Sequence, residues 1–142
     1  MVVLAAIDDS ERASRVADEA AKLAAAFDDE LHLVHVFNRS RLVDVLEVTL
    51  DDEDPAENYE VQQEADRIAA AATADVEYPA ETVVRVGDPV TNVVEYAESV
   101  DARYIVIGGR KRTPTGKALF GSVTQKVMLN ADRPVVNAPG QN

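Results

Sequence analysis

The sequence predicts an α/β fold, a single doubly wound sheet of five parallel strands with helices on both faces. Two observations lead to this prediction. Short apolar runs alternate with segments whose apolar residues recur at helical spacing. Five expected strands therefore alternate along the chain with four expected helices. The apolar runs are continuous, which is typical of strands buried on both faces of a parallel sheet. With 142 residues and 46% hydrophobic content, the chain is expected to form one domain, residues 1–142.

The first half of the chain is expected to contribute two strands and two helices. Residues 2–7 form the first apolar run, and Ser10 is expected to be the N-cap of the helix that follows. The second strand is expected at residues 31–37, and a polar, acidic stretch at 38–56 separates it from the second helix. Apolar residues at helical spacing mark the two helices: Val16, Ala20, Leu23, Ala24 and Phe27, then Val61, Ala65, Ile68, Ala69 and Ala72.

The second half is expected to contribute three strands and two helices. Strands are expected at residues 81–86 and 104–107, and Val135 and Val136 begin a short final strand. Asp88 is expected to cap the third helix, with Pro89 at its first position, where the missing amide costs nothing. The last helix is expected to open at Ser122 as N-cap, with Gln125 completing a capping box. The third helix carries one apolar face: Val90, Val93, Val94 and Ala97.

Charge is distributed unevenly along the chain. The net charge is −12, yet no acidic residue occurs between Ala102 and Ala131, a window that holds four of the six glycines. A positive, glycine-rich loop in a negative protein suits a polyanion such as a nucleoside triphosphate, because amides and cations face the phosphates and nothing repels them. The alternative is a solvated basic loop without a ligand. Basic residues in the window include Arg110, Lys111, Arg112, Lys117 and Lys126.

Composition excludes several kinds of site and partner. The chain has no cysteine, which excludes disulfides and thiol catalysis. His32 and His35 lack a flanking ligand pattern, so we expect packing or surface roles for them and no metal site. A net charge of −12 repels nucleic acid and anionic membranes.

The composition also carries an expectation about habitat. No apolar run reaches the length that crosses a bilayer and no leader sequence is visible, so a cytoplasmic protein is expected. The chain has fourteen Asp and twelve Glu but only four Lys. Such an acidic surface suits the salt-rich cytosol of a halophile, because ions there screen the repulsion between surface charges.

A doubly wound sheet places its ligand beyond the carboxyl ends of the strands, where the strand order reverses. This rule selects three loops: the one that starts at Asp8 and Asp9, the one that starts at Val36, and the glycine-rich segment 108–121. The last segment is longer than most strand-to-helix connections, and long loops in compact domains are usually functional. Charge and topology therefore indicate the same loop.

Several segments of the chain resemble those of the universal stress protein family. The runs Ile107-Gly108-Gly109-Arg110 and Gly121-Ser122-Val123 look like its phosphate-binding signature, in which a glycine, two residues, a glycine, nine residues and Gly-Ser or Gly-Thr follow the fourth strand. The similarity spans the chain and also rests on these segments: Asp8 after the first strand, Leu33-Val34-His35-Val36, the turn Gly87-Asp88-Pro89, and Arg133-Pro134-Val135-Val136.

The resemblance implies a strand order of 3-2-1-4-5, a homodimer, and bound ATP with or without Mg²⁺. It implies that Asp8 contacts the adenosine and that Val36 holds the adenine through its backbone. Ile107 and Gly108 would approach the ribose and phosphates. The remaining site residues would surround the phosphates: Gly109, Arg110, Lys111, Gly121, Ser122 and Val123. Val135 and Val136 lie at the expected sheet edge, which favours dimerisation through the last strand.

Lys111 departs from the family pattern, since it occupies the place of the second signature glycine. A left-handed backbone at this position would cost Lys111 on the order of 1 kcal/mol in strain. The alternative is that Lys111 supplies a cation to the phosphates. Ser122 likewise has two compatible roles, as a phosphate contact and as a helix cap.

Two other α/β classes fit the sequence less well. A receiver-type enzyme needs a lysine near the fifth strand, and residues 135–138 contain none. In a P-loop enzyme a serine or threonine would follow Lys117, where the chain has Ala118. No catalytic constellation emerges, because Asp8 is the only carboxylate that the topology places near the site. Slow ATP turnover is left open, as is a nucleotide-free, dimeric interaction module of the same family.

Overall fold

The computed structural model describes residues 1–40, 42, 58–108, 111–112, 118–119 and 121–139. The strands are β1 (Val2–Ala6), β2 (Glu30–Phe37), β3 (Ala80–Val86), β4 (Tyr104–Gly108), β5 (Lys111–Arg112), β6 (Ala118–Leu119) and β7 (Val135–Ala138). The helices are α1 (Ala13–Phe27), α3 (Tyr59–Ala72), α4 (Pro89–Ser99) and α5 (Ser122–Asn130).

Five of these strands form one sheet in the order β3-β2-β1-β4-β7, and every neighbouring pair is parallel. Since β7 is the fifth strand of this sheet, the predicted order 3-2-1-4-5 and the predicted fold class are confirmed. The short strands β5 and β6 form a separate antiparallel pair within the glycine-rich segment. The sequence did not predict this pair.

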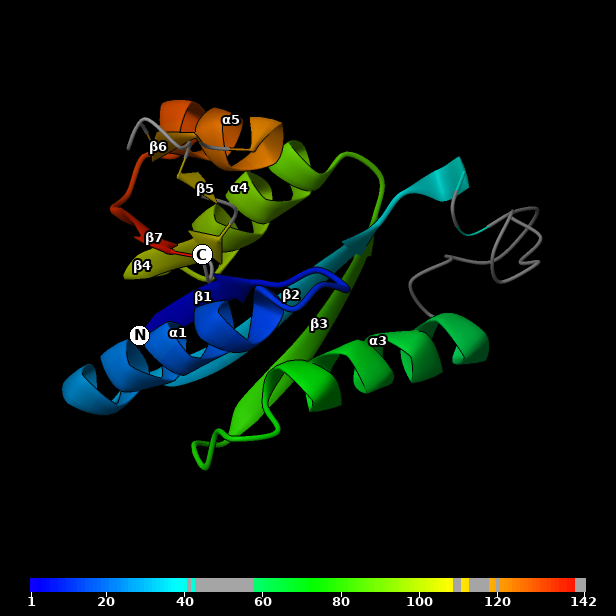
Figure 1. Ribbon diagram of the computed structural model, residues 1–142, viewed down its shortest axis with the longest axis horizontal. Coiled ribbons are helices and arrows are strands. Elements are labelled where there is room, and N and C mark those ends of the chain that lie inside the picture. The colour runs from blue at the N-terminus through cyan, green and yellow to red at the C-terminus, as the bar shows by residue number, and fades with distance from the viewer. Residues whose placement is uncertain (41, 43–57, 109–110, 113–117, 120, 140–142) are drawn as a thin grey trace.

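Helices cover both faces of the sheet, with α1 and α3 on one side and α4 and α5 on the other (Figure 1). The strands are buried from both sides because successive side chains point to opposite faces. In β1, Val3 and Ala5 pack with α1 and α3, whereas Leu4 packs with α4 and α5. The continuous apolar runs in the sequence reflect this double burial.

The ends of two helices test the predicted caps. Asp88 caps α4 as predicted, and its carboxylate accepts a hydrogen bond from the Thr91 amide at 2.9 Å, with Pro89 at the first helical position. The prediction that Ser10 caps α1 is wrong. The N-cap is Arg12, and the Ser10 hydroxyl instead donates a hydrogen bond to the Asp8 carboxylate.

None of the described helices combines the length and the hydropathy that a membrane-spanning segment requires.

Candidate functional site

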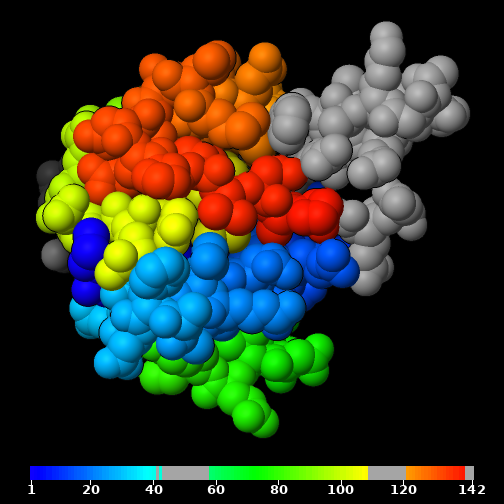
Figure 2. Space-filling model, turned by 90° about the vertical axis from the view of Figure 1, so that its left-hand side faces the viewer, coloured from blue at the N-terminus to red at the C-terminus, as the bar shows by residue number. Residues whose placement is uncertain are grey.

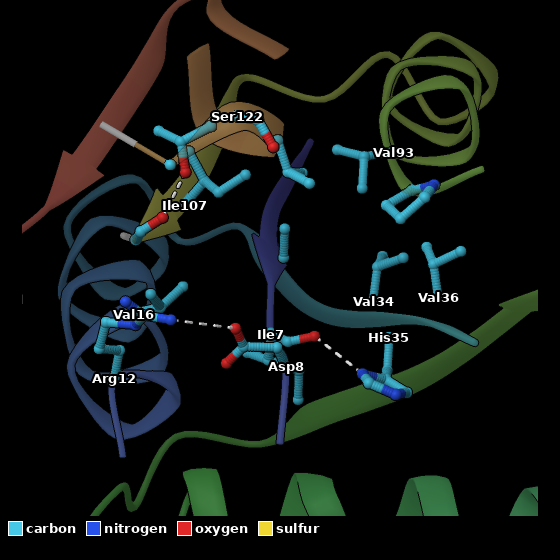
Figure 3. A pocket seen from close by; sticks show the side chains of 16 residues that line it. Ile7, Asp8, Arg12, Val16, Val34, His35, Val36, Val93, Ile107 and Ser122 are labelled. Atoms are coloured by element: carbon cyan, nitrogen blue, oxygen red, sulfur yellow. Dashed lines mark hydrogen bonds and ion pairs between the residues drawn. The ribbon is translucent and has the colours of Figure 1, made fainter. Parts of the chain in front are cut away.

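A pocket of about 350 Å³ opens at the carboxyl ends of β1, β2 and β4 (Figure 3). It lies where the strand order reverses, because the chain proceeds from β1 to β2 on one side and places β4 on the other. Its lining comes from the three strands and the starts of α1, α4 and α5: Ala6, Ile7, Asp8, Arg12, Val16, Val34, His35, Val36, Pro89, Val93, Ile107, Gly108, Gly121, Ser122, Val123 and Thr124.

Most of the site residues predicted from the sequence lie in this lining. Gly109 and Arg110 are outside the described residues. Lys111 lies in β5, and any residue can adopt the extended backbone of a strand. Lys111 therefore does not carry the strain of a left-handed backbone. The structure brings together Asp8, Val36, Ile107, Gly108, Gly121, Ser122 and Val123.

The start of α5 forms one wall of the pocket. Gly121 is the N-cap, with φ −64° and ψ 158°, and no side chain among the described residues caps the helix. The predicted capping box at Ser122 is therefore wrong, since Ser122 is already the first helical residue. The first intrahelical bond runs from the Gln125 amide to the Gly121 carbonyl, so the preceding amides lack a helical acceptor. Within the part of the chain that the structure describes, this wall presents amide donors without a helical acceptor, together with the positive end of a helix dipole.

Gly108 is required by packing rather than by its backbone angles. A Cβ atom at this position would lie 2.8 Å from Cγ2 of Val16 and 3.5 Å from the carbonyl oxygen of Ala138. The carbonyl of Gly108 accepts a hydrogen bond from the buried Thr124 hydroxyl. The end of β4 is therefore held closely between α1, β7 and α5.

Asp8 and Arg12 form the charged part of the lining. A carboxylate oxygen of Asp8 lies 3.9 Å from a guanidinium nitrogen of Arg12, and both side chains are exposed. At this separation in contact with solvent the ion pair is weak. Among the described lining residues, Arg12 is the only one with a permanent positive charge. It can exchange its contact with Asp8 for an anionic ligand.

An apolar side faces these charges. Val34, Val36 and Val93 lie together on the side of the pocket away from Arg12 (Figure 3). His35 is 5% exposed, and its Nδ1 donates to the carbonyl oxygen of Ile7 at 2.9 Å. This bond joins the end of β1 to β2. The burial of His35 agrees with its predicted packing role, but its place in the pocket was not predicted.

Several lining residues were not predicted from the sequence, among them Arg12, Thr124 and Val93. The sequence does contain a signal that places Arg12 at the pocket, because Arg12 lies four residues after Asp8, at the start of a helix that follows a switch-point strand. Thr124 and Val93 had none, since their spacing is that of ordinary core positions. Their role follows from the packing of α4 and α5 against the sheet.

A doubly wound sheet with a pocket at its switch point defines a class of α/β ligand-binding domains. Within this class, the chain belongs to the universal stress protein family, whose sequence model matches residues 1–139.

Several relatives are similar over nearly the whole chain. The universal stress protein YxiE of Bacillus subtilis is 29% identical over 94% of this chain and 95% of its own. A solved universal stress protein from Archaeoglobus fulgidus has 31% identity and a TM-score of 0.71, with 96% of each chain covered. Another structure from that organism, a universal stress protein in complex with dAMP, has 27% identity and a TM-score of 0.65, covering 96% of this chain and 94% of that one.

Two further curated relatives match over short segments only. The aligned regions of 50 and 49 residues cover 30% and 38% of those proteins' lengths.

Proposed function

We propose that this protein binds ATP in the pocket at the carboxyl ends of β1, β2 and β4, and that it acts as a dimeric stress-response or regulatory module. One observation carries the proposal. The uncapped start of α5 and an apolar side face the same pocket, and this combination suits a ligand with a charged phosphate chain and a flat base.

The start of α5 would bind the phosphates. The amides of Ser122 and Val123 precede the first intrahelical bond and are available as donors. A phosphate at such a helix start gains roughly 0.3–1 kcal/mol when exposed and up to about 2 kcal/mol when partly buried. Arg12 would add a charge-assisted hydrogen bond from the opposite wall.

The apolar side would bind the nucleoside. Val34, Val36 and Val93 offer a surface for the adenine, and the Val36 backbone would hold its edge. Asp8 lies at the end of β1 with an exposed carboxylate, which can accept hydrogen bonds from the hydroxyls of a ribose. Ile107 and Gly108 would lie beside the sugar and the first phosphate.

Relatives support an adenine nucleotide as the ligand. The Archaeoglobus fulgidus protein solved in complex with dAMP is 27% identical and shares the fold over 96% of this chain. Triphosphate rather than monophosphate is inferred from the basic, acid-free window between Ala102 and Ala131. Within the described lining no second carboxylate accompanies Asp8 as a base for hydrolysis, so catalysis is not proposed.

The wider biological context follows from charge and from the sheet edge. We place the protein in a salt-rich cytoplasm, without nucleic-acid or membrane partners, because its net charge is −12. We assign the dimer contact to β7, which pairs only with β4 among the described strands and lies at the surface between α5 and α1 (Figure 2).

Mass spectrometry of denatured protein, purified without added ligand, tests the proposal directly, and calorimetric titration with ATP, with and without Mg²⁺, gives stoichiometry and affinity. We expect one ATP per chain. Gly121→Val should abolish binding, because side-chain bulk at the helix start blocks the phosphates, while the circular dichroism spectrum stays near that of the wild type. Leu129→Val, an exposed change at the other end of α5, is the control. Wild-type affinity in Gly121→Val, or no binding by the wild type, would leave the nucleotide-free interaction module as the better account.

A further inference from the structure

Three potential metal ligands meet at the end of the sheet opposite to the pocket. Glu30 and His32 lie at the start of β2, and Glu81 lies near the start of β3. The strand register pairs His32 with Glu81, and Glu30 is two residues from His32 on the same face of the strand. One ligand atom from each residue lies within 4.8 Å of the others. The face is the one that α4 covers (Figure 1).

The imidazole of His32 is buried, and one of its nitrogens makes no hydrogen bond among the described residues. The residue is 6% exposed, and its Nε2 has no hydrogen-bond partner in the part of the chain that the structure describes. Its Nδ1 lies 2.7 Å from the Tyr96 hydroxyl on α4. With the proton on Nδ1 donated to Tyr96, Nε2 presents a lone pair. Metal-binding histidines commonly fix their other nitrogen in this way.

The position of Glu81 fits a shared ion better than a direct hydrogen bond. Its Oε2 lies 3.1 Å from Nε2 of His32, yet the two atoms are not aligned as a hydrogen bond. Two ligands on a tetrahedral ion with bonds of about 2.0–2.1 Å lie roughly 3.3 Å apart. The observed separation is therefore close to that of two atoms bound to one metal.

We propose that Glu30, His32 and Glu81 bind a divalent transition-metal ion, for which Zn²⁺ is the probe. His32 binds through Nε2, each glutamate through a carboxylate oxygen, and water completes the shell. One imidazole with two carboxylates suits Zn²⁺, whereas Mg²⁺ and Ca²⁺ prefer oxygen ligands alone. The sequence indicated no metal site, because the third ligand comes from another strand and no local spacing reveals it.

The proposed ion would join β2 to β3, and β3 is an edge of the five-stranded sheet. The side chain of Glu81 is 67% exposed, so it can adjust to the ion, while His32 stays fixed by Tyr96. An ion that binds the folded state stabilises it by mass action. We therefore expect Zn²⁺ to raise the melting temperature of the protein.

Calorimetric titration of nucleotide-free, metal-free protein with Zn²⁺ in high salt tests the site. The salt screens unspecific attraction to the acidic surface, and the absence of ATP removes a competing chelator. We expect one Zn²⁺ per chain at micromolar concentration, with no comparable binding of Mg²⁺. Glu81→Gln and His32→Gln should each weaken binding at least tenfold, since even the loss of a group that only supports a metal ligand typically costs roughly 10–100-fold in affinity. Zinc should also shift the imidazole resonances of His32 in NMR spectra.

Glu98→Gln is the matched control, since it removes one exposed carboxylate from α4 outside the cluster. It should bind Zn²⁺ like the wild type. Because Glu81 is exposed, Glu81→Gln keeps the test valid even if His32→Gln does not fold. The proposal is overturned if the wild type does not bind Zn²⁺, if Glu81→Gln binds it unchanged, or if Glu98→Gln weakens binding as much as Glu81→Gln does.

Discussion

The hydroxyl of Thr124 donates a hydrogen bond to the carbonyl oxygen of Gly108. This bond connects the first turn of α5 to the last residue of β4, and it lies in the pocket lining. Gly108, the first residue of the glycine-rich segment 108–121, is thus bound to Thr124, which lies just beyond the end of that segment. The pocket wall on this side depends on that connection.

Replacing Thr124 by Val should therefore weaken the fold. The change keeps the shape of the buried side chain but removes the donor and leaves the Gly108 carbonyl without it. We expect the free energy of unfolding to fall by about 1–3 kcal/mol, the cost of an unsatisfied buried group. Urea unfolding measures the effect, and Thr124→Ser, which retains the hydroxyl, should lose less. Equal stability of the Val and Ser variants would contradict the prediction.

Gly108→Ala should destabilise the protein through a steric conflict. The new Cβ atom would lie 2.8 Å from Cγ2 of Val16, and valine side chains are rotationally stiff. We expect a loss of about 1–3 kcal/mol, as for other overpacked cores. A double-mutant cycle identifies the cause. In a Val16→Ala background the same change should cost clearly less, whereas an equal cost in both backgrounds would mean that Val16 is not the obstacle.

The stability of the fold should depend on pH through Asp29. Its side chain is 2% exposed and accepts a hydrogen bond from Arg103 at 2.6 Å. This bond holds the pKa of the Asp29 carboxyl below its ordinary value. Since the folded-state pKa is lower than the unfolded one, the stabilisation is present above about pH 3.9 and is lost as the pH falls through the folded-state pKa.

Urea unfolding of the wild type and of Asp29→Asn between pH 7 and pH 3 measures this contribution. The variant should be less stable at pH 7, and the difference between the two proteins should shrink as the medium becomes acidic. Asp75→Asn, which changes an exposed aspartate, is the control and should follow the wild type. A difference in the free energy of unfolding that stays constant across the whole pH range would rule out Asp29 as a source of the pH dependence.

Dimerisation through β7 predicts a defined mass in solution. The strand is a free edge among the described strands, and such edges pair readily with another copy. Sedimentation at high salt should show a species near twice 15.4 kDa. At low salt the net charge of −12 should weaken association. A monomer at every concentration and salt level would exclude the contact.

Replacing Lys111 by Gly tests whether the departure from the family signature strengthens ATP binding. Salt weakens long-range attraction, so a cation in direct contact with a phosphate is the most effective one in a salt-rich cytosol. If Lys111 supplies that cation, Lys111→Gly should weaken ATP binding in molar salt by about 1 kcal/mol. Calorimetry on both proteins gives the answer. Tighter binding by the glycine variant would show that the lysine side chain is a burden.

The parts of the fold that follow from local patterns were predicted well. The apolar run at 2–7 became β1, and the Asp88 carboxylate caps α4. Both signals lie within a few neighbouring residues, so the sequence displays them directly. The strand order came from the family resemblance, because the neighbours of a strand in a sheet are decided by contacts between distant segments.

Features that depend on backbone angles or distant contacts were not predicted. Ser10 and Ser122 both have the side chain of a cap, but Ser10 bonds to Asp8 and Gly121 takes the N-cap position of α5. The strands β5 and β6 have two residues each, too few for any periodicity to show. The pocket residues Arg12 and Thr124 meet only after α1 and α5 have packed.

The sides of the pocket differ from one another in chemical character. Figure 3 shows Asp8 and Ser122 on different sides of the cavity, with the valines at 34, 36 and 93 along a third. Within the described lining, Asp8 is the one carboxylate, so the phosphates of the proposed nucleotide would lie toward Ser122 and Arg12 rather than against Asp8. The proposed nucleotide would therefore be favoured in one orientation, and a short symmetrical anion would gain little from the valines. On the proposed function, a preference for an elongated, unsymmetrical ligand would come from the described walls of the pocket themselves.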